Sequence, residues 1–244
     1  RLGAHELFRE ALRPKLAGVE SLRVAAHKRF WNAGRQVYVD ARPDDGTSPI
    51  YSQHANFMAV LAGVCPAPAR VPLLKRIIDP AMLGPIPVGE HSLGKRRNPE
   101  PDKLVPVGTL WFGHFLVQAL FENGLDDLAL EQMRMMWGAH DDLPTVPETR
   151  IQADNTFLCH GWGGGPAYLL PAYVLGVQPV ARGWSEVKVA PHAGDLIEAK
   201  GALATPRGPL TVSWSKQGGK VKLAVTPPDG MKVETGNNDI VREH

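Results

Sequence analysis

The longest apolar segment of the sequence, GTLWFGHFLVQALFEN, covers residues 108–123. Apolar side chains would lie on nearly all sides of a helix formed by this segment, which predicts a helix buried on most faces. Asn123-Gly124 provides a helix end, and apolar residues recur at helical spacing over residues 125–137. The very short connection predicts an antiparallel helical hairpin.

Helical spacing also occurs at residues 4–32 (as two helices), 51–63, 70–78 and 166–175. Ser21 is expected to cap the second helix of the first segment. Pro166 suits the first position of the last helix, because its missing N–H would have no helical partner there. Residues 79–106 are rich in Pro and Gly, which predicts a long loop.

The pattern changes at Gly176. Residues 210–214 and 221–225 alternate apolar and polar positions between Gly and Pro residues, as half-buried strands do. Gln217-Gly218-Gly219 between them predicts a hairpin turn. The last third is therefore predicted to be a small antiparallel β-sandwich. The predicted fold class is α+β in two domains, helical hairpins and then strands, over residues 1–175 and 176–234, with a polar tail at 235–244.

Composition and charge narrow the function. The 244 residues suffice for one large or two ordinary domains. The formal net charge of +2 is nearly balanced, which argues against nucleic acid or an anionic membrane surface as the main partner. No stretch approaches the ~18 apolar residues of a membrane span. Two cysteines, Cys65 and Cys159, and scattered histidines without HExxH or HxH spacing predict no disulfide framework and no metal site. None of these features settles the compartment.

The segment from 141 to 171 holds the candidate chemistry. Glu148 lies in a proline-rich loop, and Cys159-His160-Gly161-Trp162 and three glycines precede Pro166. A carboxylate, an imidazole and an indole on irregular backbone beside a helix start predict a binding pocket, because loops on a rigid scaffold usually carry function. The alternative is a Pro/Gly-rich connector between two helices.

Two other types of site are disfavoured in this segment. Cys159-His160 is a poor nucleophile–base pair, because adjacent side chains point apart and no third group orients them. The triple glycine lacks the Gly-Lys-Ser/Thr ending of a nucleotide loop, so no cofactor is predicted.

Several runs carry a family resemblance. They are GTLWFGHFLVQALFENGLDDLALEQMRMMWG, the loop with Glu148, CHGWGGGPAYLLPAYVLGVQPV and VKVAPHAGDLIEAKGALATPRGPLTVSW. Together they resemble the C-terminal half of the bacterial α-L-rhamnosidases of glycoside hydrolase family 78, and the resemblance extends from about Leu22 to about Lys232. It implies an incomplete (α/α)6 toroid followed by a β-sandwich.

The resemblance also implies a reaction, the inverting hydrolysis of terminal α-L-rhamnosides. In such chemistry a carboxylic acid protonates the departing oxygen, and a second carboxylate, roughly 6.5–9.5 Å away, activates water on the opposite face of the sugar. Glu148 falls at the position of the general base. His160 and Trp162 match pocket residues that would hydrogen-bond sugar hydroxyls and cover the ring. Trp111 and His114, on the apolar helix, are candidates either for substrate contact or for core packing.

The sequence departs from the family in two places. The run Pro144-Thr145-Val146-Pro147-Glu148 lacks the aromatic residue that usually precedes the base. Nothing in residues 1–140 resembles the acidic motif that carries the general acid. We therefore expect a missing N-terminal segment of the toroid, or a partner chain, to supply that acid. The alternative is a catalytically incomplete carbohydrate-binding or structural toroid fragment.

Overall fold

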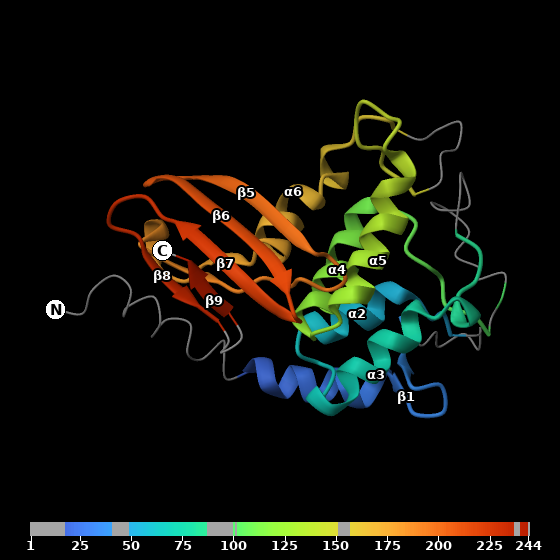
Figure 1. Ribbon diagram of the computed structural model, residues 1–244. Helices are drawn as coiled ribbons and strands as arrows, with labels where there is room; N and C mark the ends of the chain where they lie inside the picture. The colour runs from blue at the N-terminus through green and yellow to red at the C-terminus, as the bar shows by residue number, and fades with distance from the viewer. Residues whose placement is uncertain are drawn as a thin grey trace. The chain divides into compact units, whose positions relative to one another are not determined.

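The computed structural model describes residues 18–40, 49–86, 100, 102–150, 157–236 and 240–243. The chain forms two compact units, Arg1–Gly108 and Thr109–His244 (Figure 1). Helices and sheets are both present, which confirms the α+β class. The predicted domain boundary after residue 175 lies inside the second unit, where helices give way to strands, and it stays a prediction.

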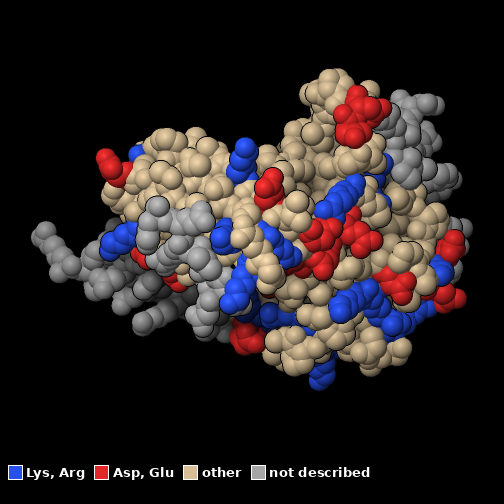
Figure 2. Space-filling model, viewed as in Figure 1, with Lys and Arg blue, Asp and Glu red and all other residues tan. Residues whose placement is uncertain are grey.

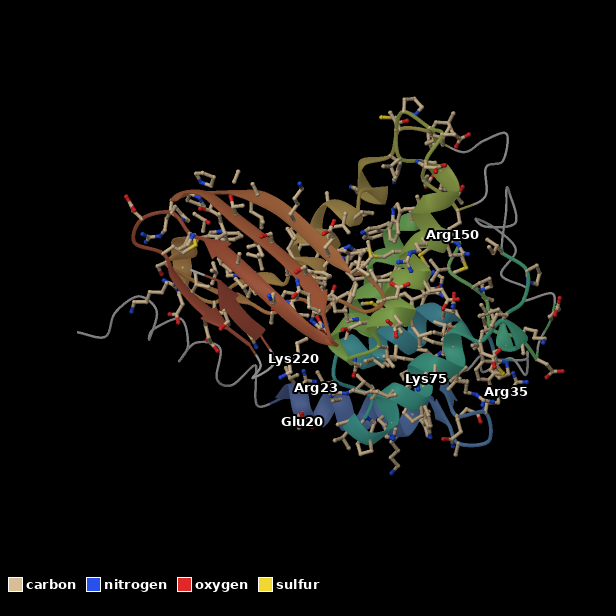
Figure 3. All side chains as sticks on the ribbon, viewed as in Figure 1. Glu20, Arg23, Arg35, Lys75, Arg150 and Lys220 are labelled. Atoms are coloured by element: carbon tan, nitrogen blue, oxygen red, sulfur yellow. The ribbon has the colours of Figure 1, made fainter. Side chains whose placement is uncertain are left out.

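The first unit begins, in the part that is described, with a helix over residues 18–30. Ser21 lies inside this helix, and its hydroxyl donates to the Gly18 carbonyl at 3.3 Å, so the predicted cap at Ser21 is wrong. Figure 3 labels Glu20 and Arg23 on this helix, where their side chains pair at 3.4 Å. The other helix predicted within residues 4–32 falls mainly outside the described residues.

A two-stranded sheet and two helices complete the core of this unit. The antiparallel strands are β1 (Trp31–Asn32) and β2 (Val37–Tyr38). The predicted helices are confirmed as α2 (Gln53–Leu61) and α3 (Ala67–Ile78), followed by the 3-10 turn η1 (Pro80–Met82). Ser52 caps α2, because its hydroxyl accepts the Ala55 N–H at 3.2 Å.

Buried amides connect these elements. The Asn56 side chain accepts the Tyr38 N–H at 2.7 Å and donates to the carbonyls of Tyr38 (3.1 Å) and Ser52 (2.7 Å). Gln53 donates to Ile77 O at 2.8 Å and accepts the Val107 N–H at 2.7 Å. Both side chains are buried, so these bonds are shielded from water and stabilise the unit.

The second unit begins with the predicted helical hairpin. Its helices are α4 (Leu110–Glu122) and α5 (Asp126–Trp137), which lie side by side in Figure 1 and are followed by the 3-10 turn η3 (Gly138–His140). Gly124 takes a φ of +69° in the turn, a conformation that glycine adopts without steric cost. A Cβ on Gly113 would lie 2.4 Å from the Met136 sulfur, so glycine lets α4 and α5 approach closely.

The chain then reaches three short helical segments. They are the 3-10 turn η4 (Gly161–Gly163), the α-helix α6 (Pro166–Leu169) and the π-helix η5 (Leu170–Val174). A single helix over residues 166–175 was the prediction. Pro171 has no backbone N–H and therefore cannot donate an i→i−4 bond, which agrees with the change to a wider turn there.

Two sheets follow. One has the order β3-β4-β8, from β3 (Val177–Pro179), β4 (Glu186–Val189) and β8 (Lys232–Thr235), with η6 (Arg182–Trp184) between the first two. The other has the order β5-β6-β7-β9, from β5 (Glu198–Thr205), β6 (Gly208–Gln217), β7 (Lys220–Thr226) and β9 (Ile240–Glu243). The predicted strands and the hairpin turn at Gly218-Gly219 are confirmed.

The pairing is mixed, whereas the sequence predicted only antiparallel strands. The pairs β3–β4, β5–β6 and β6–β7 are antiparallel, but β4–β8 and β7–β9 are parallel. Part of the predicted polar tail is strand β9, whose apolar Ile240-Val241 start suits a strand. On the face drawn in Figure 2, Lys and Arg side chains lie among acidic and uncharged surface, as the balanced charge predicts.

The strands are anchored to the helices of the same unit. The buried Trp214 indole N–H donates to the Val174 carbonyl at 2.8 Å. His192 Nδ1 lies 2.9 Å from Asp126 Oδ1 in the first turn of α5. Arg134 near the other end of α5 forms a two-pronged pair with Asp195, at 2.8 and 2.9 Å. The side chains of the loop before β5 therefore contact both ends of α5.

Candidate functional site

The backbone around Glu148 is held from two sides. The Glu148 N–H donates to the Phe157 carbonyl at 2.9 Å, and the Glu148 carbonyl accepts the Leu110 N–H at 3.0 Å. Two residues before Glu148, the Val146 carbonyl accepts the His160 N–H at 2.8 Å. Further links are the Thr109–Thr149 bridge and the Thr145 hydroxyl bond to the Leu158 carbonyl. The Glu148 segment is thus fixed between the start of α4 and the His160 loop.

Glycine allows the His160 loop to approach this segment. Gly163 is buried, and a Cβ there would lie 2.7 Å from both the Pro147 carbonyl oxygen and Val146 Cγ1. The Gly163 N–H donates to the His160 carbonyl at 2.8 Å. On the other side, the Trp137 indole N–H donates to the Gly163 carbonyl at 2.6 Å. Glycine is needed at this position because a side chain would collide with the Glu148 segment.

Three of the predicted site residues come together as an aromatic cluster. The rings of Trp111 and Trp162 have centroids 5.0 Å apart, and the His160 ring stands edge-on to Trp162 at 5.7 Å. Trp111 is 41% exposed and Trp162 66% exposed. Core packing was the alternative for Trp111, and neither indole is buried in this structure. An exposed pair of indoles is a surface that can stack on an apolar ligand face.

His114 joins the same region through the glycine-rich turn. Its Nδ1 lies 3.2 Å from the position that a Cβ on Gly165 would take, and its ring is 5.3 Å from that of Tyr168. Burial lowers the pKa of His114, and a hydrogen bond with the Gly165 backbone raises it in part. A lowered histidine pKa means a neutral ring at neutral pH, able both to donate and to accept a hydrogen bond.

Glu148 is half-buried, and Arg150 follows it by two residues. Burial lowers the pKa of Arg150, which Figure 3 labels. Residues 151–156 lie outside the described residues. This loop and the start of α4 together therefore supply a carboxylate (Glu148), two imidazoles (His160 and His114) that can bind hydroxyls, and two indoles (Trp162 and Trp111) that can stack.

The other features considered in the sequence are the two cysteines, a metal site and a membrane-spanning helix. Cys65 is buried in the first unit and Cys159 is exposed in the second, and both are free thiols. Among the residues with described positions, no group of three or more His, Cys, Asp or Glu side chains could hold a metal ion. In the same residues, no helix has the length and apolarity needed to cross a bilayer.

Sequence reasoning missed two residues of this region. Trp137 was treated only as the end of a helix, although its indole reaches the Gly163 carbonyl 26 residues later. Tyr168 was treated as a helix residue, although it is 51% exposed and lies next to His114. Tryptophan at a helix end facing a glycine-rich loop is a signal that could have indicated the first.

The strand region matches a known family. Residues 176–235 match the bacterial alpha-L-rhamnosidase C-terminal domain. The chain resembles the C-terminal region of bacterial α-L-rhamnosidases. No curated protein matches it.

Solved structures extend the likeness beyond the strands. A family 78 rhamnosidase of Bacillus sp. GL1 has 25% identity and a TM-score of 0.66, over 91% of this chain and 23% of that one. The α-L-rhamnosidase of Dictyoglomus thermophilum has 17% identity and a TM-score of 0.67, over 95% and 24%. That of Streptomyces avermitilis, complexed with L-rhamnose, has 17% identity and a TM-score of 0.61, over 91% and 20%.

The rhamnosidase-like chain spans about a quarter of the length of these structures. The likeness covers both units and confirms the resemblance inferred from the sequence. It supports a relationship to glycoside hydrolases. A closed toroid and the roles of the five candidate residues stay predictions.

Proposed function

We propose that this chain carries the general-base half of an inverting glycoside hydrolase that releases terminal α-L-rhamnose or a similar sugar. The observation that carries the proposal is the backbone clamp on Glu148, whose N–H and C=O bond to Phe157 and Leu110. The clamp ties a loop carboxylate to the segment that bears His160 and Trp162. Pre-organised groups of this kind are what catalysis by positioned acids and bases requires.

In the proposed reaction Glu148 removes a proton from water as the water oxygen attacks the anomeric carbon. The glycosidic C–O bond breaks on the opposite face, and the departing oxygen takes a proton from a carboxylic acid. We propose that this acid belongs to a segment outside the chain, because no run in residues 1–140 resembles the acidic motif of the family. Trp162 and Trp111 would cover an apolar sugar face, while His160 and His114 hydrogen-bond its hydroxyls.

The test is the Glu148→Gln substitution, introduced into the full-length natural protein and assayed on an aryl α-L-rhamnoside. Loss of the base should lower kcat by about 10²–10⁴-fold with little change in stability. Asp142→Asn is the matched control, since Asp142 is an exposed loop carboxylate six positions earlier. Turnover of the Gln variant at the level of the control would refute the assignment of the base.

A second candidate function is a carbohydrate-binding or structural piece that needs a partner segment. It is favoured by large exposed apolar side chains in the second unit, including Phe157 (68%), Leu158 (48%) and Leu170 (46%). Such side chains, when they cluster, mark interaction sites. The intact mass of the natural protein, native and denatured, should be compared with 26.5 kDa. A lone 26.5 kDa species that binds sugar without hydrolysis would favour carbohydrate binding over catalysis, whereas a larger native species that does not hydrolyse the sugar would favour a structural piece with a partner.

A further inference from the structure

We propose that Trp137 is a positioning residue of the candidate site, which holds the Trp162 turn against the Glu148 segment through one hydrogen bond to Gly163. The role in sugar binding rests on the proposed function. The positioning itself rests on contacts within the second unit and can be tested without any substrate.

The first step of the argument is where Trp137 lies. It is the last residue of α5, a helix packed against α4 with Met136 fully buried. Its indole N–H donates to the Gly163 carbonyl at 2.6 Å, and its ring edge, at Cζ2, lies 3.0 Å from the position of a Cβ on Gly165. A side chain on a packed helix is a more precise support than one on a loop.

The second step is what Gly163 carries. It ends the η4 turn (Gly161–Gly163), which presents Trp162, and its N–H bonds to the His160 carbonyl at 2.8 Å. Its α-carbon faces the Pro147 carbonyl so closely that a Cβ would lie 2.7 Å away. The Trp137 bond therefore acts on a residue that contacts both the His160 turn and the segment that precedes Glu148.

The third step is the consequence of losing the bond. Gly163 is buried, so its carbonyl would lack the indole donor in an environment with little access to water. The turn would relax away from α5, and Trp162 would leave its place 5.0 Å from Trp111. In this proposal Trp137 acts on the stacking surface through the backbone of Gly163.

The experiment uses Trp137→Phe, which removes the N–H and keeps an aromatic ring. Trp214→Phe is the matched control, because Trp214 also donates its indole N–H to a backbone carbonyl, that of Val174, at 2.8 Å. The unsubstituted protein, with six tryptophans, and the two variants, with five each, are labelled with 5-fluorotryptophan and followed by ¹⁹F NMR. L-rhamnose is then titrated into each.

We expect Trp137→Phe to shift or broaden the Trp162 and Trp111 resonances and to leave Trp214 in place. L-rhamnose binding should weaken about two- to twelvefold, because the turn must then be ordered on binding without the contribution of one hydrogen bond. Trp214→Phe should leave both site resonances and sugar binding unchanged. Unchanged Trp162 and Trp111 resonances in the Trp137 variant would overturn the proposal.

Two glycine variants keep the proposal testable if Trp137→Phe does not fold. Gly163→Ala should move the same two resonances, because its methyl group meets the Pro147 carbonyl. Gly161→Ala should not, since a Cβ there meets nothing within 4 Å. Equal effects of the two variants would overturn the proposal.

The sugar readout separates this inference from the proposed function. If Trp137→Phe shifts the resonances but the unsubstituted protein does not bind L-rhamnose, the result would support positioning and count against the sugar site. Rhamnose binding that is unaffected by Trp137→Phe, although the Trp162 and Trp111 resonances move, would support positioning of the turn and refute its role in sugar binding.

Discussion

Gly176→Ala should be among the most destabilising single methyl additions in the chain. Gly176 has a φ of +76°, and an added Cβ would lie 2.2 Å from Ala190 C, 2.3 Å from Ala190 O and 2.4 Å from Pro191 N. All three are backbone atoms, which cannot rotate away as a side chain would. The chain must therefore move at the junction between the helices and the strands.

The magnitude follows from three contributions. The left-handed conformation costs a residue with a Cβ roughly 1–2 kcal/mol. Displacing close-packed backbone costs about 1–3 kcal/mol, as overpacking does. The movement also weakens the Ala190 N–H bond to the Gly176 carbonyl, now 2.9 Å, for about 1 kcal/mol. The expected loss is about 3–6 kcal/mol, a large fraction of the ~5–15 kcal/mol typical of a folded protein.

The assay is urea denaturation followed by far-UV circular dichroism, with Gly183→Ala as the matched control. Gly183 has a φ of +60°, but a Cβ there meets nothing within 4 Å. The control therefore carries only the conformational cost, roughly 1–2 kcal/mol. If the two variants lose equal stability, the close approach to Ala190 does not matter and the reasoning fails.

Two further predictions concern the first unit. Asn56→Ala should cost about 2–4 kcal/mol of unfolding free energy, because it leaves the buried backbone groups of Tyr38 and the Ser52 carbonyl without their amide partners. A loss below 1 kcal/mol in urea denaturation would contradict this. Burial lowers the pKa of His54 to about 4, below the ~6.5 of an unfolded chain, so the unfolded state binds its proton first. Stability should therefore fall as pH drops from about 6.5 to 4, by about 3–4 kcal/mol, and His54→Gln should flatten that part of the pH profile. An identical profile in the variant would exclude His54 as the cause.

The sequence predicted the α4–α5 hairpin and the β6–β7 hairpin well, because their contacts are local and their patterns are long. It predicted burial on most faces for α4, yet Trp111 is 41% exposed. An apolar pattern shows that a face avoids water but not whether the chain itself supplies the partner. The exposed rings of Trp111 and Trp162 are therefore where pattern and structure disagree.

Contacts between distant positions were beyond the sequence pattern. The parallel pairing of β7 with β9 joins residues 221–224 to 240–243, and periodicity does not specify which strands meet. The Trp137–Gly163 bond likewise depends on how α5 ends relative to a later turn. The clamp on Glu148 was not predicted either, since backbone bonds between irregular segments leave no mark in side-chain type.

The two side-chain contacts between the loop before β5 and α5 have a consequence for how the second unit evolves and unfolds. His192 holds the first turn of α5, and Asp195 holds Arg134 three residues before its end. The strand region that matches the family is thus fastened to the helix that ends in Trp137. We expect the helices and strands of this unit to melt in one transition. Exchanging the strand region for that of a relative should alter the geometry around Trp162, unless the contacts of the loop before β5 with α5 are kept.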